Sequence, residues 1–242
     1  MPDVTPLVGE LTGYVVTPDG PGPWPGVIVI HDALGMTNDL RQQAEWLADA
    51  GYLAVAPDFF AATGKVRCMV STVHHIRDRR GGAYDDVERV RAWLAGRADC
   101  TGAIGVIGFC FGGGLALALA SGRGFSVASV NYGTTRGIAY GEDLLVDACP
   151  IVGSYGGRDP IVRRAADRLG ETLTAVGVAH DVKEYPDAGH GFMHDYEGAG
   201  DGSSKLIPFL ADRTGLWGYH EPSAEDARRR IIAFFDRHLA RA

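Results

Sequence analysis

The chain has 242 residues, 46% hydrophobic and 22% charged, a length and balance typical of a globular protein with one domain. Its formal net charge is −7 and its basic runs are short and lie beside acids, which argues against a nucleic-acid partner. The sequence contains no apolar run of membrane-spanning length, no targeting segment and only four scattered cysteines, so we expect a reducing, cytoplasmic location and no disulfide scaffold.

Short apolar runs alternate with stretches of helical periodicity along the chain, a pattern typical of a parallel sheet with crossover helices. The run 27–30 is continuously β-branched, as in a strand buried on both faces. The predicted strands are 11–17, 27–30, 52–56, 104–107, 127–131, 150–155 and 181–185, with a turn at 18–26. The predicted helices are 38–50 (capped by Asn38), 84–96, 112–121, 161–177 and 223–239. We therefore expect one α/β domain over residues 1–242, with a mostly parallel central sheet flanked by helices on both faces.

Two segments, 59–82 and 195–218, are long connections that fit this alternation poorly. Connections of this length often line a binding site. We expect the substrate pocket to take its walls from them.

The strongest local signal is the run 105–114, Gly-Val-Ile-Gly-Phe-Cys-Phe-Gly-Gly-Gly. It matches the Gly-x-nucleophile-x-Gly turn between a strand and a helix, with Cys110 at the nucleophile position. In such a strained turn, side chains two residues before and after the nucleophile collide, and Gly108 and Gly112 remove them. The pattern predicts a nucleophilic thiol at the N-terminus of a helix.

Free cysteines more often serve as small buried hydrophobes, and that alternative applies to Cys110 as well. The flanking glycines and the strand–turn–helix context favour a nucleophile. Cys68, Cys100 and Cys149 lack this context, and we expect them to be structural.

In hydrolases with this turn, the acid and the base follow the nucleophile in that order along the chain. Asp159 lies in a glycine-rich turn after a predicted strand, and we expect its carboxylate to orient the base. Because a proline follows it, Asp159 is also a candidate helix N-cap, and the two roles are compatible. His190, between Gly189 and Gly191 in the loop after the next strand, is the candidate base.

The other histidines do not form a metal-binding pattern with nearby acids, so we expect neither a metal nor a cofactor. An acyl-transfer site also needs N–H donors for the oxyanion. The turn predicts one from Phe111, directly after the nucleophile, and the loop after strand 27–30 predicts another from Ala33, with Asp32 at the mouth of the site.

Over nearly its whole length the chain resembles the dienelactone hydrolase family. The resemblance is carried by His31-Asp32-Ala33-Leu34-Gly35, Ala56-Pro57-Asp58, Gly108-Phe109-Cys110-Phe111-Gly112-Gly113, Gly157-Arg158-Asp159 and Gly189-His190-Gly191-Phe192. It implies an α/β-hydrolase fold, a Cys-His-Asp set, no cofactor and a carboxylate beside the thiol that helps to activate it.

Two positions depart from the pattern of the family. The activating carboxylate is typically a glutamate, whereas Asp32 is one methylene shorter. His194 stands where dienelactone-cleaving members carry an arginine for the substrate carboxylate. We expect Phe59, Phe192 and His194 to contact the substrate.

The sequence therefore predicts a hydrolase that cleaves a carboxylic ester or lactone through Cys110, His190 and Asp159 and a thioester intermediate. The expected partner is a small molecule, with no nucleic acid or membrane, and the oligomeric state cannot be read from the sequence. Two alternatives stay open: a ligand-binding protein without catalysis, and a redox sensor that uses the thiol of Cys110.

Overall fold

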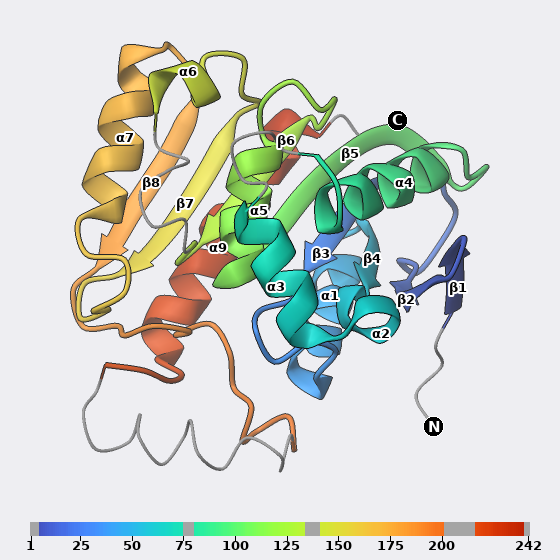
Figure 1. Cartoon of the computed structure of the whole chain (residues 1–242), viewed down its shortest axis with the longest axis horizontal. Coiled ribbons are helices and arrows are strands. Elements are labelled where there is room, and N and C mark those ends of the chain that lie inside the picture. The colour runs from blue at the N-terminus through green and yellow to red at the C-terminus, as the bar shows by residue number, and fades with distance from the viewer. Residues whose placement is uncertain (1–4, 75–79, 134–140, 201–215, 240–242) are drawn as a thin grey trace.

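The computed structural model describes residues 5–74, 80–133, 141–200 and 216–239. Its centre is one eight-stranded sheet in the order β1-β2-β4-β3-β5-β6-β7-β8 (Figure 1). The strands are β1 (Thr5–Val8), β2 (Leu11–Val16), β3 (Trp24–Ile30), β4 (Leu53–Pro57), β5 (Cys100–Phe109), β6 (Val127–Asn131), β7 (Ile151–Gly156) and β8 (His180–Tyr185). Strands β3 to β8 run parallel, whereas β1 and β2 form an antiparallel hairpin at one edge. The mostly parallel sheet that the sequence predicts is confirmed.

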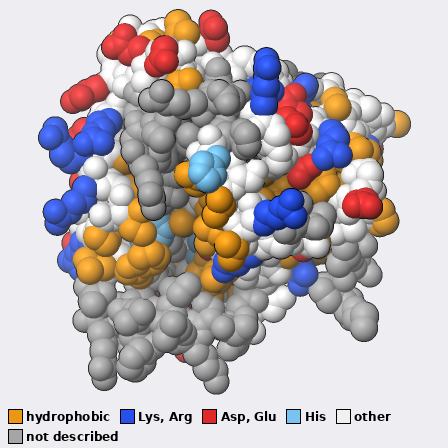
Figure 2. Space-filling view, viewed as in Figure 1, with side chains coloured by type: hydrophobic (Ala, Val, Ile, Leu, Met, Phe, Trp, Pro, Cys, Tyr) orange, Lys and Arg blue, Asp and Glu red, His pale blue; other side chains and the backbone are white. Residues whose placement is uncertain are grey.

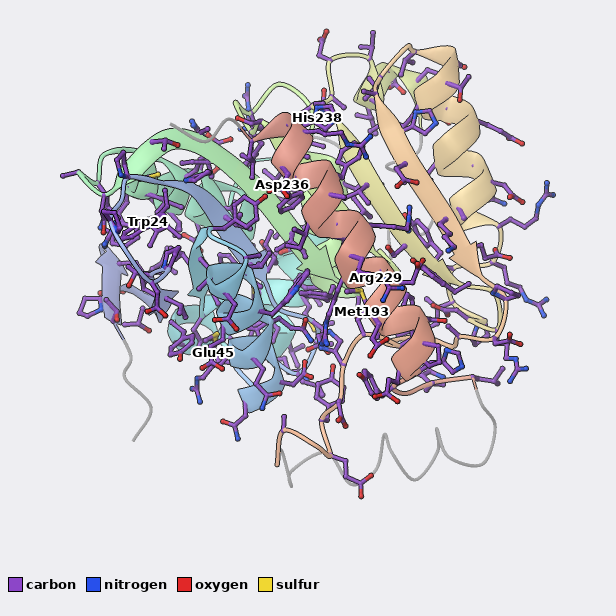
Figure 3. All side chains as sticks on the ribbon, turned by 180° about the vertical axis from the view of Figure 1, so that it is seen from behind. Trp24, Glu45, Met193, Arg229, Asp236 and His238 are labelled. Carbon is purple, nitrogen blue, oxygen red and sulfur yellow. The ribbon has the colours of Figure 1, made fainter. Side chains whose placement is uncertain are left out.

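Helices cover both faces of this sheet. Seen from behind, α1 (Asn38–Asp49) and α9 (Glu221–His238) cross one face, and Arg229, Asp236 and His238 lie along α9 (Figure 3). The opposite face carries α4 (Ala83–Ala95) and α5 (Phe111–Leu119) (Figure 1). Every residue of α5 is buried, because this apolar helix lies between the sheet and its neighbours. None of the helices in the described ranges is both long enough and apolar enough to cross a bilayer.

The predicted strand 127–131 has the predicted bounds, but the N-terminal region differs from the prediction. The turn expected at 18–26 ends earlier, because β3 already begins at Trp24, where it pairs with Cys100 of β5. Strand β1 was not predicted. It is short and half-buried, so its sequence carries little hydrophobic pattern.

One predicted N-cap and one predicted helix start were wrong, and in both places a side chain accepts a hydrogen bond from a backbone N–H two or three residues later. Thr37, not Asn38, caps α1, since its hydroxyl accepts a hydrogen bond from the N–H of Leu40 at 3.1 Å. The helix expected from 161 begins later, as α7 (Ala165–Ala175), because the residues before it form a turn closed by Asp159 Oδ1 and the N–H of Ile161 at 2.8 Å.

The connection 59–82 is not irregular, since it contains α2 (Phe59–Thr63) and α3 (Lys65–His74). Asp58 starts α2 by accepting hydrogen bonds from the N–H groups of Phe60 and Ala61. A further short helix, α6 (Glu142–Leu145), follows β6. Of the second long connection, 201–215 lies outside the described residues.

Candidate active site

The predicted chemical groups follow four parallel strands, β3, β5, β7 and β8, at the same end of the sheet. Asp32 comes after β3, Cys110 after β5, Asp159 after β7 and His190 after β8. The carboxyl ends of parallel strands point to the same edge, which is where open α/β sheets bind ligands. The topology therefore brings these side chains together from positions far apart in the sequence.

Cys110 occupies a strained turn between β5 and α5. Its backbone has φ 52° and ψ −113°, a left-handed region that non-glycine residues rarely adopt. The turn is held in place because the N–H of Cys110 donates to the carbonyl of Asn131 at 3.0 Å, and its carbonyl accepts from the N–H of Gly114 at 3.1 Å. The strained turn predicted at this position is confirmed, and it leaves Cys110 half-buried while its neighbours are fully buried.

The two flanking glycines are required by close backbone approaches. A Cβ on Gly108 would lie 2.0 Å from the carbonyl oxygen of Gly112, which leaves no room for any side chain. A Cβ on Gly112 would lie 2.5 Å from the carbonyl oxygens of Ile30 and His31. The elbow is thus packed directly against the end of β3, where the loop with Asp32 and Ala33 begins.

Asp159 and His190 form a buried pair. The ring Nδ1 of His190 hydrogen-bonds Asp159 Oδ2 at 2.6 Å, and both side chains are almost completely excluded from solvent. The other carboxylate oxygen, Oδ1, accepts from the N–H of Ile161. One carboxylate therefore both closes its own turn and fixes the imidazole, so the two roles considered for Asp159 coexist in geometry, although the element that it caps is a turn.

The imidazole of His190 faces Cys110 with its other nitrogen. Nε2 is buried, and the described residues offer it no acceptor that meets hydrogen-bond geometry. Burial by itself lowers the pKa of His190, but the hydrogen bond that the ring donates to Asp159 and the adjacent Cys110 sulfur outweigh it and raise the pKa to about 9. The site is therefore built to favour an imidazolium next to the sulfur.

The backbone and ring of His190 are also held by the segment that precedes α9. Its N–H donates to the carbonyl of Leu216 at 2.7 Å, and its carbonyl accepts from the N–H of Gly218 at 3.0 Å. The ring of Trp217 packs edge-on against the imidazole, with centroids 4.6 Å apart. These contacts hold the backbone of His190 on two sides and its ring on one.

The other cysteines occupy different environments. Cys68 and Cys100 are buried, and burial raises the pKa of the Cys100 thiol. Burial raises the pKa of Cys149 to about 12, so its sulfur stays protonated at neutral pH. Only Cys110, among the cysteines, combines partial exposure with a histidine beside it and a helix N-terminus.

The loop after β3 is shaped by its own carboxylate. Asp32 Oδ1 accepts from the N–H of Leu34 at 2.6 Å, and Oδ2 accepts a short hydrogen bond from the hydroxyl of Tyr196. Ala33 lies inside the turn that Asp32 and Leu34 close. Phe111 opens α5, and N–H groups in the first turn of a helix have no acceptor within it.

His194 does not face a substrate space. Its ring is fully buried, and its Nδ1 forms a short hydrogen bond with Asp39 Oδ2 in the first turn of α1. Burial lowers the pKa of His194 and raises that of Asp39, but the attraction between the two overrides burial, so the pKa of the histidine is raised and that of the carboxyl lowered. The expectation that His194 contacts the substrate is not supported by its position.

Phe59 and Phe192, the other candidates for substrate contact, also lie in the core. Phe59 packs against His31 with ring centroids 5.4 Å apart, and Phe192 packs between Tyr132 and Tyr185. Their exposed fractions are 1% and 0%, which leaves no surface for a ligand in this structure. Their rings are part of the core that packs against His31 and Tyr132.

The connection after β4 presents an apolar stripe to solvent. Val66, Val70 and Val73 of α3 are exposed, on the side opposite the buried Cys68 and Thr72. Hydrophobic side chains accordingly gather at the centre of the face over α3, with histidine side chains visible among them (Figure 2). This stripe points outward, so it is not the floor of the site.

Sequence reasoning missed Tyr132 and the hydrogen bond between Tyr196 and Asp32. Tyr132 follows β6 in a left-handed conformation (φ 39°), and its buried ring lies 5.2 Å from that of His190. Tyr132 directly follows a strand that neighbours β5, and this position could have indicated that it lies near Cys110. Tyr196 gave no such signal, since its partner Asp32 lies 164 residues away.

Comparisons with known proteins agree with this architecture. The model of the dienelactone hydrolase family matches residues 11–239. A protein of Yersinia pestis that is provisionally named a carboxymethylenebutenolidase is 28% identical over 95% of this chain and 84% of its own length, and a carboxymethylenebutenolidase of Rhodococcus opacus is 27% identical over 88% and 81%.

Among solved structures, one from Klebsiella pneumoniae that is provisionally described as a dienelactone hydrolase has a TM-score of 0.77 and 25% identity, covering 96% of this chain and 97% of its own. The α/β-hydrolase MGS-M1, from a deep-sea metagenome of the Medee basin, has a TM-score of 0.66 at 14% identity, covering 98% and 97%. The fold of the chain is that of the α/β-hydrolases, as predicted.

Proposed function

This chain belongs to the dienelactone hydrolase family and is a hydrolase, and from that premise we propose that it cleaves a carboxylic ester or lactone through Cys110, His190 and Asp159. The observation that carries the proposal is the buried Asp159–His190 hydrogen bond directed at a cysteine in a strained strand-to-helix turn. A nucleophile, a base and an acid that orients the base together form an acyl-transfer triad.

In the first half of the reaction, the sulfur of Cys110 gives its proton to Nε2 of His190 and attacks the carbonyl carbon. The carbonyl oxygen becomes an oxyanion, for which the N–H groups of Phe111 and Ala33 are the proposed donors. When the intermediate collapses, the C–O bond breaks and the imidazolium protonates the leaving alkoxide. The product of this half is a thioester on Cys110.

In the second half, His190 takes a proton from water, and the resulting hydroxide attacks the thioester carbonyl. The C–S bond then breaks, the carboxylic acid leaves and the proton returns to the sulfur. Asp159 keeps Nδ1 protonated throughout, so Nε2 is the nitrogen that exchanges the proton. Thiolate is a better leaving group than an amine, so this chemistry favours esters with good leaving groups over amides.

The test is hydrolysis of p-nitrophenyl acetate by the parent protein, by Cys110→Ala and by Cys149→Ala. We expect a burst of p-nitrophenol and an acetyl adduct on Cys110 detected by mass spectrometry, both absent from Cys110→Ala and both retained in Cys149→Ala. A protein that only binds ligands shows no burst. Turnover of Cys110→Ala at the parent rate would falsify the mechanism.

A further inference from the structure

Asp32 follows β3 in the loop that the elbow packs against, and both oxygens of its buried carboxylate accept hydrogen bonds. Oδ1 accepts from the N–H of Leu34 in the same loop at 2.6 Å, and Oδ2 accepts from the Tyr196 hydroxyl. Ala33, the proposed oxyanion donor, is the residue between Asp32 and Leu34. The carboxylate therefore determines how this N–H group is presented.

Tyr196 is itself fixed by the segment that carries the base. Its ring stacks on that of His194, with centroids 5.0 Å apart and planes 14° apart. His194 in turn bonds to Asp39 at the start of α1, and the N–H of Asp195 donates to Asp39 Oδ1 at 2.8 Å. The contacts of His194 and Asp195 with Asp39 thus hold Tyr196 where its hydroxyl can donate to Asp32.

The same segment is bonded to α1 at two more places. Gln43 donates to the carbonyl of Met193 at 3.0 Å, and Asn38 donates to the carbonyl of Ala199 at 3.4 Å. Because α1 directly follows the loop that begins at Asp32, residues 193–199 hold that loop at both of its ends. The loop with the oxyanion donor and the loop with His190 therefore form one unit.

The charge of Asp32 also acts on the residues that it contacts or that lie behind them. Burial, then the charge of Asp32, raise the pKa of Tyr196, and Asp32 also acts on His194. The pKa of His190 is instead governed, besides burial, by Asp159 and Cys110. The charge of Asp32 thus acts on Tyr196 and His194, the residues packed beside its loop.

We propose that Asp32 and Tyr196 are positioning residues for the oxyanion loop: their hydrogen bond fixes the N–H of Ala33 against the reacting carbonyl. This inference rests on the proposed function. It gives Asp32 a role different from the activation of the thiol that the family resemblance implies.

Alkylation of Cys110 by iodoacetamide separates the two roles, because displacement of iodide by sulfur forms no oxyanion. We expect Tyr196→Phe to lower kcat for p-nitrophenyl acetate about tenfold, with KM nearly unchanged, since the oxyanion forms only in the transition state. The rate of Cys110 alkylation across a pH series should equal that of the parent. Tyr14→Phe is the matched control, since it removes a tyrosine–carboxylate hydrogen bond to Glu45 on the surface.

Substitutions of Asp32 give a second, independent readout. An asparagine keeps an oxygen that can accept from the N–H of Leu34, whereas an alanine keeps neither contact. A positioning role predicts that Asp32→Asn retains more activity than Asp32→Ala, with unchanged alkylation in both. Thermal unfolding of each variant shows whether it is folded.

Two results would overturn the inference: equal losses in Asp32→Asn and Asp32→Ala together with slower alkylation of Cys110, or parent kcat in Tyr196→Phe. The first would assign the carboxylate to activation of the thiol, and the second would make the contact purely structural. Failure of the proposed function is distinct, because then the parent protein itself shows no ester hydrolysis that depends on Cys110.

Discussion

The side chains of Asp159 and His190 are joined by a hydrogen bond of 2.6 Å from ring Nδ1 to Oδ2, although 31 positions separate them in the chain. The bond exists because β7 and β8 are parallel neighbours, so the loops that follow them meet at the same edge of the sheet. It leaves Nε2 as the ring nitrogen that faces the sulfur. In the proposed mechanism, this contact decides which ring nitrogen exchanges a proton with Cys110.

Asp159→Asn tests that dependence. The amide can keep the turn, with its oxygen accepting from the N–H of Ile161, but its NH₂ group then faces Nδ1 and favours the wrong tautomer. In other triads such a change lowers kcat by about 10⁴, and we expect a loss of at least about a thousandfold here.

The matched control is Asp187→Asn. Asp187 lies three residues before His190 on the same loop, but its side chain is exposed, and among the described residues its ion pair is with the exposed Arg158. Its substitution should leave kcat within about twofold, because exposed ion pairs contribute little. Comparable losses in the two variants would mean that the whole loop, rather than the carboxylate of Asp159, carries the effect.

Gly112→Ala tests the packing of the elbow against β3. The new methyl group would lie 2.5 Å from two backbone oxygens, which cannot move without shifting the end of the strand. We expect a loss of about 1–3 kcal/mol in the free energy of unfolding, as for other overpacked sites, together with loss of activity. Urea denaturation measures the first and ester hydrolysis the second.

Gly170→Ala supplies the opposite expectation from the same chemical change. Gly170 lies inside α7, and a Cβ there meets nothing within 4 Å. Alanine should stabilise the protein by about 0.5–1 kcal/mol, because it has the higher helix propensity. If both variants lost stability equally, close packing at the elbow would not be the cause.

The predicted part of the site follows from strand ends. Cys110 comes directly after the strand β5, and Asp159 and His190 lie in the loops that follow β7 and β8. Parallel strands place the loops at their carboxyl ends together, so the order of the three residues and their context were enough to propose them as one set. Gly108 was predictable because its close contact is local: a Cβ there would meet the carbonyl oxygen of Gly112. The contacts of Gly112 with Ile30 and His31 depend on the fold, and the turn pattern alone indicated that glycine.

What could not be predicted depends on long-range contacts or on solvent exposure. The pairs Tyr196–Asp32 and His194–Asp39 join residues 164 and 155 positions apart. A tyrosine or a histidine in a sequence does not indicate which distant carboxylate it will contact. Helix α3 was missed because its valines face solvent, the reverse of the usual pattern. Thr37 and Asn38 are both good N-caps, and only the bond to Leu40 decides between them.

Reactivity of the cysteines provides a further prediction. Cys149 has a pKa of about 12, and Cys100 is buried with a raised pKa, so both remain thiols at neutral pH. Cys110 is half-buried and has an imidazole beside it that can accept its proton. We expect iodoacetamide at neutral pH to modify Cys110 first, as read by peptide mass spectrometry, and His190→Gln to slow this reaction.

The comparison variant for this experiment is Cys149→Ala, whose labelling at Cys110 should match that of the parent. Denatured protein should label at all four cysteines, which shows that the selectivity belongs to the fold. Modification of Cys149 as fast as Cys110 in the native protein would remove the special environment assigned to the nucleophile.

Stability should fall as the pH rises above neutrality. The pKa of His190 is raised from 6.5 to about 9 in the folded protein, and that of His194 is raised as well. A histidine with a raised folded pKa stabilises fully below its unfolded pKa, and the contribution is lost as the pH passes through the folded value. For His190 this contribution to the free energy of unfolding is at most about 3 kcal/mol, and it is lost between roughly pH 6.5 and 9.

Urea denaturation across this range measures the slope of the unfolding free energy against pH. The slope should be reduced in His190→Gln and, separately, in His194→Gln, because each variant lacks one of the two groups that release a proton. Both variants lose a buried partner of an aspartate, so their stability at neutral pH is lower and only the change with pH is diagnostic. A parent protein equally stable at both ends of the range would show that neither aspartate holds its histidine in the charged form.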